Sequence, residues 1–172
     1  MAAIFSCVCS CCGQRYEGSP SYAFTMPDHY FQLTPEEQNE RGNIDKNICS
    51  IRHDEHTDYF IRVCLEIPIH GVISPFLWGV WVSIGKDNLK RYLQTWDDAD
   101  EHDAYFGWLC NNMSLYPSTL GLKTLAHPRR DNVRPWLELE PSEHPLYLDW
   151  KNGLSIEQAK ALVLKSMHQS QQ

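Results

Sequence analysis

Cysteines close to the start of the chain are the residues whose type and spacing could do chemistry. Four of the seven cysteines fall within residues 7–12, namely Cys7, Cys9, Cys11 and Cys12. Two residues separate Cys9 from Cys12, and Gly13 follows, which makes a Cys-x-x-Cys-Gly knuckle. Two thiolates at this spacing can bind one Zn²⁺, because the glycine permits the tight turn beneath them. The pattern predicts half of a zinc site.

The other half of such a site must come from elsewhere in the chain, because a structural zinc takes four protein ligands. No second knuckle follows, so Cys49 is the best third ligand, and Cys64 or a histidine is a candidate fourth. We therefore predict zinc binding by Cys9, Cys12 and Cys49. Buried thiols without a metal are the alternative. Cys7 and Cys11 are extra thiols that could exchange with the main pair or be oxidised.

A redox role like that of thioredoxin is disfavoured by the surroundings of Cys9 and Cys12. Such a pair needs to lie at the N-terminus of a helix that follows a strand, where the helix dipole lowers a thiol pKa. Here the knuckle is followed by turn-forming residues. Metal binding is the better interpretation of this spacing.

Residues 53–56, His-Asp-Glu-His, carry the side chains of a metal site, but we interpret them as a solvated turn between two strands. The HExxH zinc motif needs two histidines one helical turn apart, which this segment does not offer. The sequence also lacks a GxSxG nucleophile elbow and a glycine-rich nucleotide loop. It therefore names no catalytic residue and no nucleotide cofactor.

Acidic and aromatic residues gather in residues 97–108 and predict a surface for a protein partner. The predicted surface consists of Asp97, Asp98, Asp100, Glu101, Tyr105 and Trp108. Exposed Trp and Tyr side chains are common anchors of protein interfaces. The net charge of −7, from 22 acidic and 15 basic residues, favours a basic partner and disfavours nucleic acid, whose phosphates the chain repels.

Apolar patterns predict the strands that must position these residues. Five strands are expected, over residues 48–51, 58–67, 76–84, 120–126 and 133–139. Residues 58–67 alternate like a half-buried strand that pairs with the first, and residues 76–84 are apolar on both faces like a central strand. Pro135 places the last strand at a sheet edge, since proline cannot donate to a ladder.

Capping signals and helical spacing predict three helices. Residues 34–37 supply a threonine N-cap, a first-turn proline and the glutamate of a capping box for a short helix that ends near Gly42. Apolar residues at helical spacing predict a second helix over residues 89–96. Ser155 and Gln158 cap a final helix.

The order of these elements predicts a single α+β domain over residues 1–172. We expect a mainly antiparallel sheet of about five strands, packed by two or three helices, with the sheet and its intervening helices in residues 35–150. Residues 1–34 are expected to form an irregular cysteine-rich head, and residues 151–172 a C-terminal helix.

Seven motifs in a fixed order resemble one bacterial family. They are the knuckle at residues 9–13 and the motifs at residues 49–51, 60–68, 78–82, 105–109, 116–122 and 139–146. Together they are similar to the family catalogued as domain of unknown function 2199. The resemblance implies a small cytoplasmic bacterial domain whose recurrent cysteines match Cys9, Cys12 and Cys49, and it implies no function. Cys7 and Cys11 are additional here, which leaves open which pair would hold a metal.

The compartment follows from the cysteines and from the apolar runs. The first residues lack the basic and apolar regions of a signal peptide, and no apolar run reaches the roughly 18 residues of a membrane span. Crowded cysteines in odd number fit a reducing compartment, so we expect a cytoplasmic protein without a membrane partner. We expect a non-enzymatic protein-binding module, such as an immunity-type protein that neutralises a cognate toxin. The alternative is a zinc- or thiol-dependent enzyme, or a metal-stabilised domain, that uses the knuckle cysteines.

Overall fold

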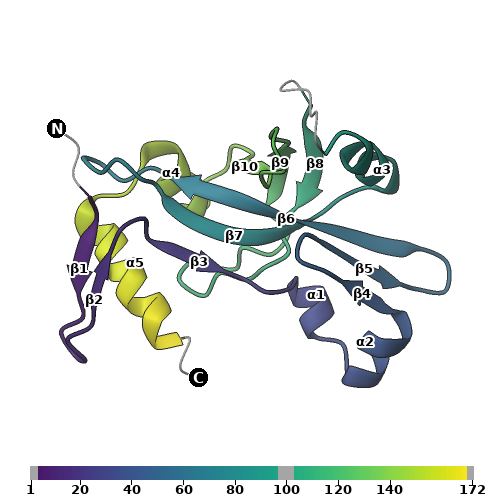
Figure 1. Ribbon diagram of the computed structural model, residues 1–172, viewed down its shortest axis with the longest axis horizontal. Helices are drawn as coiled ribbons and strands as arrows, with labels where there is room; N and C mark the ends of the chain where they lie inside the picture. The colour runs from purple at the N-terminus through teal and green to yellow at the C-terminus, as the bar shows by residue number, and fades with distance from the viewer. Residues whose placement is uncertain (1–3, 97–102, 170–172) are drawn as a thin grey trace.

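Strands dominate the computed structural model, which describes residues 4–96 and 103–169 (Figure 1). The strands are β1 (Ser6–Val8), β2 (Arg15–Glu17), β3 (Ser21–Ala23), β4 (Gly42–Ile44), β5 (Ile48–Arg52), β6 (Thr57–Ile67), β7 (Phe76–Ser83), β8 (Tyr105–Trp108), β9 (Lys123–His127) and β10 (Trp136–Leu139). The helices are α1 (Asp28–Phe31), α2 (Pro35–Arg41), α3 (Lys86–Gln94), α4 (Pro145–Asn152) and α5 (Ile156–Gln169). None of the helices in these ranges is long and apolar enough to cross a membrane.

The fold is α+β, but its sheet is larger and more mixed than predicted. The described residues form ten strands in two sheets and five helices. β1 and β2 form a separate hairpin. The other eight strands form one sheet, in which the order β3-β7-β6-β10-β9-β8 is extended by β5 beside β6 and by β4 beside β5. β3 runs parallel to β7, and β10 parallel to β6. The prediction of one mainly antiparallel sheet of about five strands was therefore wrong.

The predicted irregular head, residues 1–34, contains strands and a helix where it is described. β1, β2 and β3 have three residues each, too few for an alternating period to show in the sequence. Phe5 and Cys7 are buried in the same apolar cluster as Ala159 and Val163 of α5, and Figure 1 shows the β1–β2 hairpin beside that helix. Burial against α5 positions the β1–β2 hairpin, and pairing with β7 positions β3.

Pro135 does not place β10 at a sheet edge. β10 lies between β9 and β6, and its parallel pairing with β6 joins Trp136 to Cys64. Proline has no amide hydrogen to donate, but its carbonyl oxygen still accepts a hydrogen bond, here from the Cys64 amide at 2.9 Å. An interior strand accommodates Pro135 because this residue precedes the strand and serves only as an acceptor.

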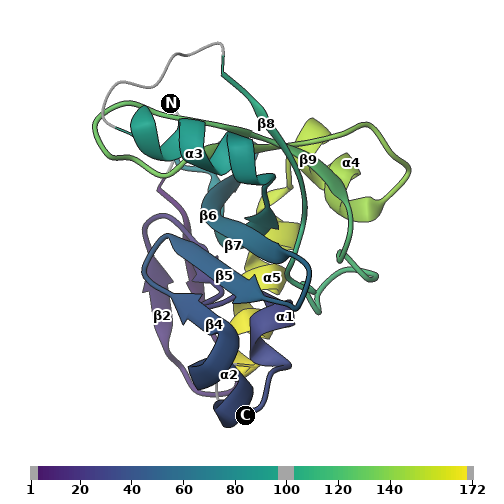
Figure 2. The same cartoon turned by 90° about the vertical axis from the view of Figure 1, so that its right-hand side faces the viewer.

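The large sheet curls until β8 reaches β7. Leu109, directly after β8, forms an antiparallel bridge with Val82 of β7. Gly107 permits this approach, because a Cβ atom there would lie 2.1 Å from the Ser83 carbonyl oxygen. Figure 2 looks onto this end of the molecule, where α3, β8, β5 and α1 surround β6 and β7.

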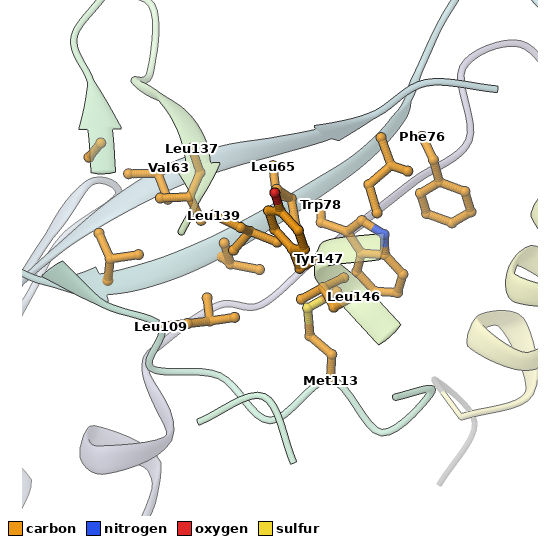
Figure 3. Close-up of a cluster of buried hydrophobic side chains, with 14 of the residues drawn as sticks. Val63, Leu65, Phe76, Trp78, Leu109, Met113, Leu137, Leu139, Leu146 and Tyr147 are labelled. Atoms are coloured by element: carbon orange, nitrogen blue, oxygen red, sulfur yellow. The ribbon is translucent and has the colours of Figure 1, made fainter. Parts of the chain in front are cut away.

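Apolar side chains pack on both faces of the large sheet. β6 alternates as predicted, and the buried residues of its main face are Ile61, Val63, Leu65 and Ile67. Leu146 and Tyr147 of α4 cover this face (Figure 3). Side chains that alternate to the opposite face form a second cluster, which contains Tyr30, Cys49, Ile51, Phe60, Trp81 and Cys110. β6 and β7 are thus covered on both sides.

Two predicted helix caps are confirmed. In α2 the Thr34 hydroxyl accepts from the Glu37 amide, and the Glu37 carboxylate accepts from the Thr34 amide. Ser155 and Gln158 make the same reciprocal pair before α5. The sequence did not predict α4, because its N-cap is a histidine and not the usual Ser, Thr, Asp or Asn. The ring nitrogen of His144 accepts a hydrogen bond from the Leu146 amide in the first turn.

Candidate functional site

A groove opens where β6, β7 and β8 converge. Its volume is about 700 Å³, within the range of about 300–1,000 Å³ that ligand pockets occupy. We call it the aromatic groove. It is lined by residues 57–60, 83–86, 106–110 and 120–121 together with His29. The curl of the sheet therefore creates a concave surface from strands that are far apart in the sequence.

Two aromatic side chains of β8 face the aromatic groove. Phe106 and Trp108 are 41% and 44% exposed, and Leu120 adds a third exposed apolar side chain. The two rings meet edge to face with their centroids 5.3 Å apart. Strand alternation turns Tyr105 to the opposite side, where it is buried in the core. Of the two predicted aromatic residues, only Trp108 is at the surface, and its alternation with Phe106 could have indicated that second ring.

The histidine and the charged side chains of the groove are His29, Asp58 and Lys86. The His29 ring lies against Phe60, with 5.6 Å between ring centroids. The predicted acidic residues Asp97, Asp98, Asp100 and Glu101 lie outside the described residues. The groove thus combines an apolar floor with a few polar groups, which suits an amphipathic ligand.

Two histidines and an aspartate meet at the β5–β6 turn, next to the aromatic groove. His53 and His56 flank the tip of this turn, which the His53 amide closes by donating to the His56 carbonyl oxygen at 2.8 Å. Their rings stack with centroids 4.5 Å apart. The Asp58 carboxylate lies 3.0 Å from His53 Nε2 and 3.5 Å from His56 Nε2. We call these three side chains the histidine hairpin.

The segment is the turn that its sequence indicated, but its side chains are not separately solvated. Residues that flank a two-residue turn face each other across a hairpin, and a residue two positions further lies on the same face. This rule could have grouped His53, His56 and Asp58. Periodicity alone does not show the grouping, because Asp58 belongs to a strand pattern and the two histidines to a turn pattern.

Three thiols gather in the turn between β1 and β2. The sulfur atoms of Cys9, Cys11 and Cys12 lie within 4.8 Å of one another, so this group could hold a metal ion. Gly13, with a φ of +70°, donates its amide to the Cys9 carbonyl oxygen at 2.8 Å and closes the turn. We call these three residues the cysteine turn. The predicted knuckle spacing therefore does bring Cys9 and Cys12 together, with Cys11 as a third thiol.

Hydrogen bonding sets the protonation of the cysteine turn. A hydrogen bond of 2.9 Å links the Cys9 and Cys11 sulfur atoms. This bond, together with the Cys12 and Cys11 backbone, lowers the pKa of Cys9 to about 6. The same bond holds the proton on Cys11 and raises the pKa of that thiol to about 11. At neutral pH Cys9 is therefore a thiolate, which is the form that binds metals and acts as a nucleophile.

Cys49 does not join the cysteine turn. It is buried in the second apolar cluster with Trp81 and Cys110, and Figure 1 shows β5 and the β1–β2 hairpin at opposite ends of the molecule. Burial raises the pKa of Cys49 to about 12. The pairing of Cys49 with Phe60 fixes this side chain on a core face. The structure thus brings together two of the three predicted zinc ligands.

Comparison with known proteins places most of this chain in one bacterial family. A family model described as "Uncharacterized protein conserved in bacteria (DUF2199)" matches residues 8–154. That range contains the cysteine turn, the histidine hairpin and all the residues that line the aromatic groove. No curated protein and no solved structure matches the chain. The comparisons therefore supply no activity, and a proposal must rest on the geometry.

Proposed function

The chain belongs to this family of uncharacterised bacterial proteins, and we propose that it is a protein-binding module whose aromatic groove takes an apolar segment of a basic partner. The observation that carries the proposal is the presence of two exposed aromatic rings, Phe106 and Trp108, in one groove. Aromatic side chains dominate interface energetics because each can bury about 150–250 Å². Adjacent rings in a concave site are typical anchors of an interface.

The surroundings of Trp108 hold its ring in place before a partner arrives. Phe106 contacts it edge to face, and the Lys123 ammonium lies 6.0 Å from its ring centroid. A side chain that is already positioned loses little rotamer freedom on binding, so more of its contact energy appears as affinity. By contrast, Phe31 is 73% exposed on α1 and does not line the groove. Exposure alone therefore does not single out the two groove rings.

The charge of the chain supports a basic partner. The net charge of −7 attracts cationic proteins over distances of about a Debye length and raises their association rate. Within the groove the charges of Asp58 and Lys86 are opposite, so the support for a basic partner comes from the charge of the whole chain. An immunity-type protein that neutralises a basic toxin is one module of this kind.

Affinity capture with the tagged full chain from its bacterial source, under reducing conditions, tests the proposal. We expect one stoichiometric basic protein on the wild type and on the control variant Phe31→Ala, and none on Trp108→Ala. Formation of the purified complex should slow as salt is raised. A partner that Trp108→Ala retains fully would contradict the proposal, as would a chain that carries only a small molecule in the groove.

Zinc binding at the cysteine turn is a second candidate function, favoured by three thiols within 4.8 Å of one another. Three thiolates leave one tetrahedral position open, for water or for a partner's ligand, as in open zinc sites. Metal analysis should find one Zn²⁺ fewer per chain in a Cys9→Ser, Cys12→Ser variant than in the wild type, and no such difference in Cys64→Ser. Equal zinc content in all three chains would exclude this turn as the site.

A further inference from the structure

We infer that the histidine hairpin, formed by His53, His56 and Asp58, binds a divalent transition-metal ion of the Zn²⁺ class. Two imidazoles and one carboxylate are ligands that such ions take in proteins. The ligand atoms lie within 4.8 Å of one another. With metal–ligand distances of about 2.1 Å, the ligand atoms of a tetrahedral site lie about 3.4 Å apart. His53 Nε2 lies 3.0 Å from Asp58 Oδ2 and His56 Nε2 lies 3.5 Å from Asp58 Oδ1, so each imidazole is close to that separation from one carboxylate oxygen.

A proton links two of these ligand atoms in the structure. Arg41 Nη1 lies 3.3 Å from His53 Nδ1, and a guanidinium can only donate, so Nδ1 is the acceptor. The neutral His53 ring therefore carries its proton on Nε2 and donates it to Asp58 at 3.0 Å. An ion bound at Nε2 replaces this proton.

Arg41 opposes this replacement. When Nε2 binds an ion, the neutral ring carries its remaining proton on Nδ1, where it faces the guanidinium donor. Arg41 must then withdraw from His53. The Glu37 carboxylate, 2.8 Å from Arg41 Nη2, can keep the guanidinium after it leaves the ring. Removal of the Arg41 side chain should consequently tighten metal binding.

The place of the histidine hairpin gives the ion access to ligands from outside. The hairpin borders a hollow of about 570 Å³ that shares Thr57, Tyr59 and Lys86 with the aromatic groove. Asp58 lines the groove itself. Three protein ligands leave at least one coordination position, which water or a donor group of a groove occupant can fill. The metal site stands without the proposed partner, because its three ligands come from this chain alone.

Metal titrations of the untagged full chain test the inference. The cysteine turn could also bind metal, so the background is the variant Cys9→Ser, Cys11→Ser, Cys12→Ser. We expect one Co²⁺ per chain, with the intense visible bands of a four- or five-coordinate ion and without a thiolate charge-transfer band. His56→Ala should weaken Zn²⁺ binding, measured by calorimetry, by at least about 100-fold, since loss of even an outer hydrogen-bond partner of a metal ligand costs 10–100-fold.

Asp58→Asn and Asp54→Asn form a matched pair, because each removes one carboxylate charge from the same turn and only Asp58 belongs to the cluster. We expect Asp58→Asn to weaken Zn²⁺ binding, Asp54→Asn to leave it unchanged and Arg41→Ala to tighten it. Equal weakening by the two asparagine variants would overturn the site in favour of diffuse charge attraction. Absence of Co²⁺ binding by a folded background chain would overturn it as well.

Imidazole NMR on the wild-type chain answers the same question if the serine background does not fold. Long-range nitrogen–proton correlations report the tautomer of each histidine ring. Zn²⁺ should move the His53 and His56 resonances and leave those of His127 and His144, which lie outside the cluster, in place. Unmoved His53 and His56 resonances at saturating Zn²⁺ would contradict the inference.

Discussion

The rings of Phe106 and Trp108 meet edge to face, 5.3 Å apart, on the exposed side of β8. Between them, Gly107 lies so close to the Ser83 carbonyl oxygen that no side chain fits. The contact that closes β8 onto β7 therefore also turns the two rings outward into the groove. In this protein the candidate binding surface is a direct consequence of how the sheet closes.

Gly107→Ala should destabilise the fold strongly. Its Cβ would lie 2.1 Å from a backbone oxygen, so β8 must move away from β7, and we expect a loss of about 3 kcal/mol, the upper end of what overpacking costs. Urea denaturation measures the change. Gly85→Ala is the matched control, because a Cβ there meets nothing within 4 Å. Gly85 is the N-cap of α3, where alanine in place of glycine should change the free energy of unfolding by no more than about 1 kcal/mol. Similar midpoints for both variants would contradict the closure described here.

Thr34→Ala should remove about 1 kcal/mol from the free energy of unfolding. The substitution leaves the Glu37 amide without its acceptor at the start of α2. Thr34→Ser keeps a hydroxyl at the same place and should recover most of the loss. Thermal unfolding followed by circular dichroism compares the three chains, and a serine variant as unstable as the alanine variant would show that the cap is not the cause.

Cys9 should titrate well below an ordinary thiol. The bond to Cys11 and the neighbouring backbone amides lower its pKa to about 6, so ultraviolet thiolate absorbance of the reduced chain should rise by one thiolate near that pH. Cys9→Ser should abolish this step. Cys110→Ser should preserve it, because burial raises the pKa of Cys110 to about 12. A first thiolate that appears only near pH 9 would contradict the prediction.

The same pKa shift makes stability depend on pH. In the unfolded chain Cys9 returns to the ordinary thiol pKa of 9.0, whereas in the folded chain the pKa is about 6. Between these values the unfolded chain binds more protons, so stability should rise with pH from about 6 to 9 and be lost as pH falls through 6. Unfolding of wild type and Cys9→Ser across this window checks the sign. Parallel profiles for the two chains would contradict it.

Alternation could be read from the sequence in a long strand but not in a short one. The period of two in residues 58–67 placed Ile61 and Val63 on the core face, as the structure confirms. The same rule would have exposed Phe106 and buried Tyr105, but β8 has four residues and its period is too short to stand out. Length of the repeat thus decided what could be predicted.

Long-range pairing was not readable from any local pattern. Cys49 looked like a partner for the knuckle because its residue type fits zinc, yet its pairing with Phe60 in β6 sends it to a separate core cluster. Pro135 looked like an edge marker, yet its carbonyl oxygen serves an interior strand pair. In both cases tertiary pairing, and not local propensity, fixed the position.

The affinity of the captured partner for three purified chains tests the central claim most directly. Calorimetry would compare wild type, Trp108→Ala and Phe31→Ala, each checked for an unchanged unfolding midpoint. The groove predicts that Trp108→Ala weakens binding by about 30-fold or more, equivalent to about 2 kcal/mol, while Phe31→Ala, which removes the more exposed ring, leaves it unchanged. Equal affinities of Trp108→Ala and wild type would contradict the assignment of the aromatic groove as the partner site.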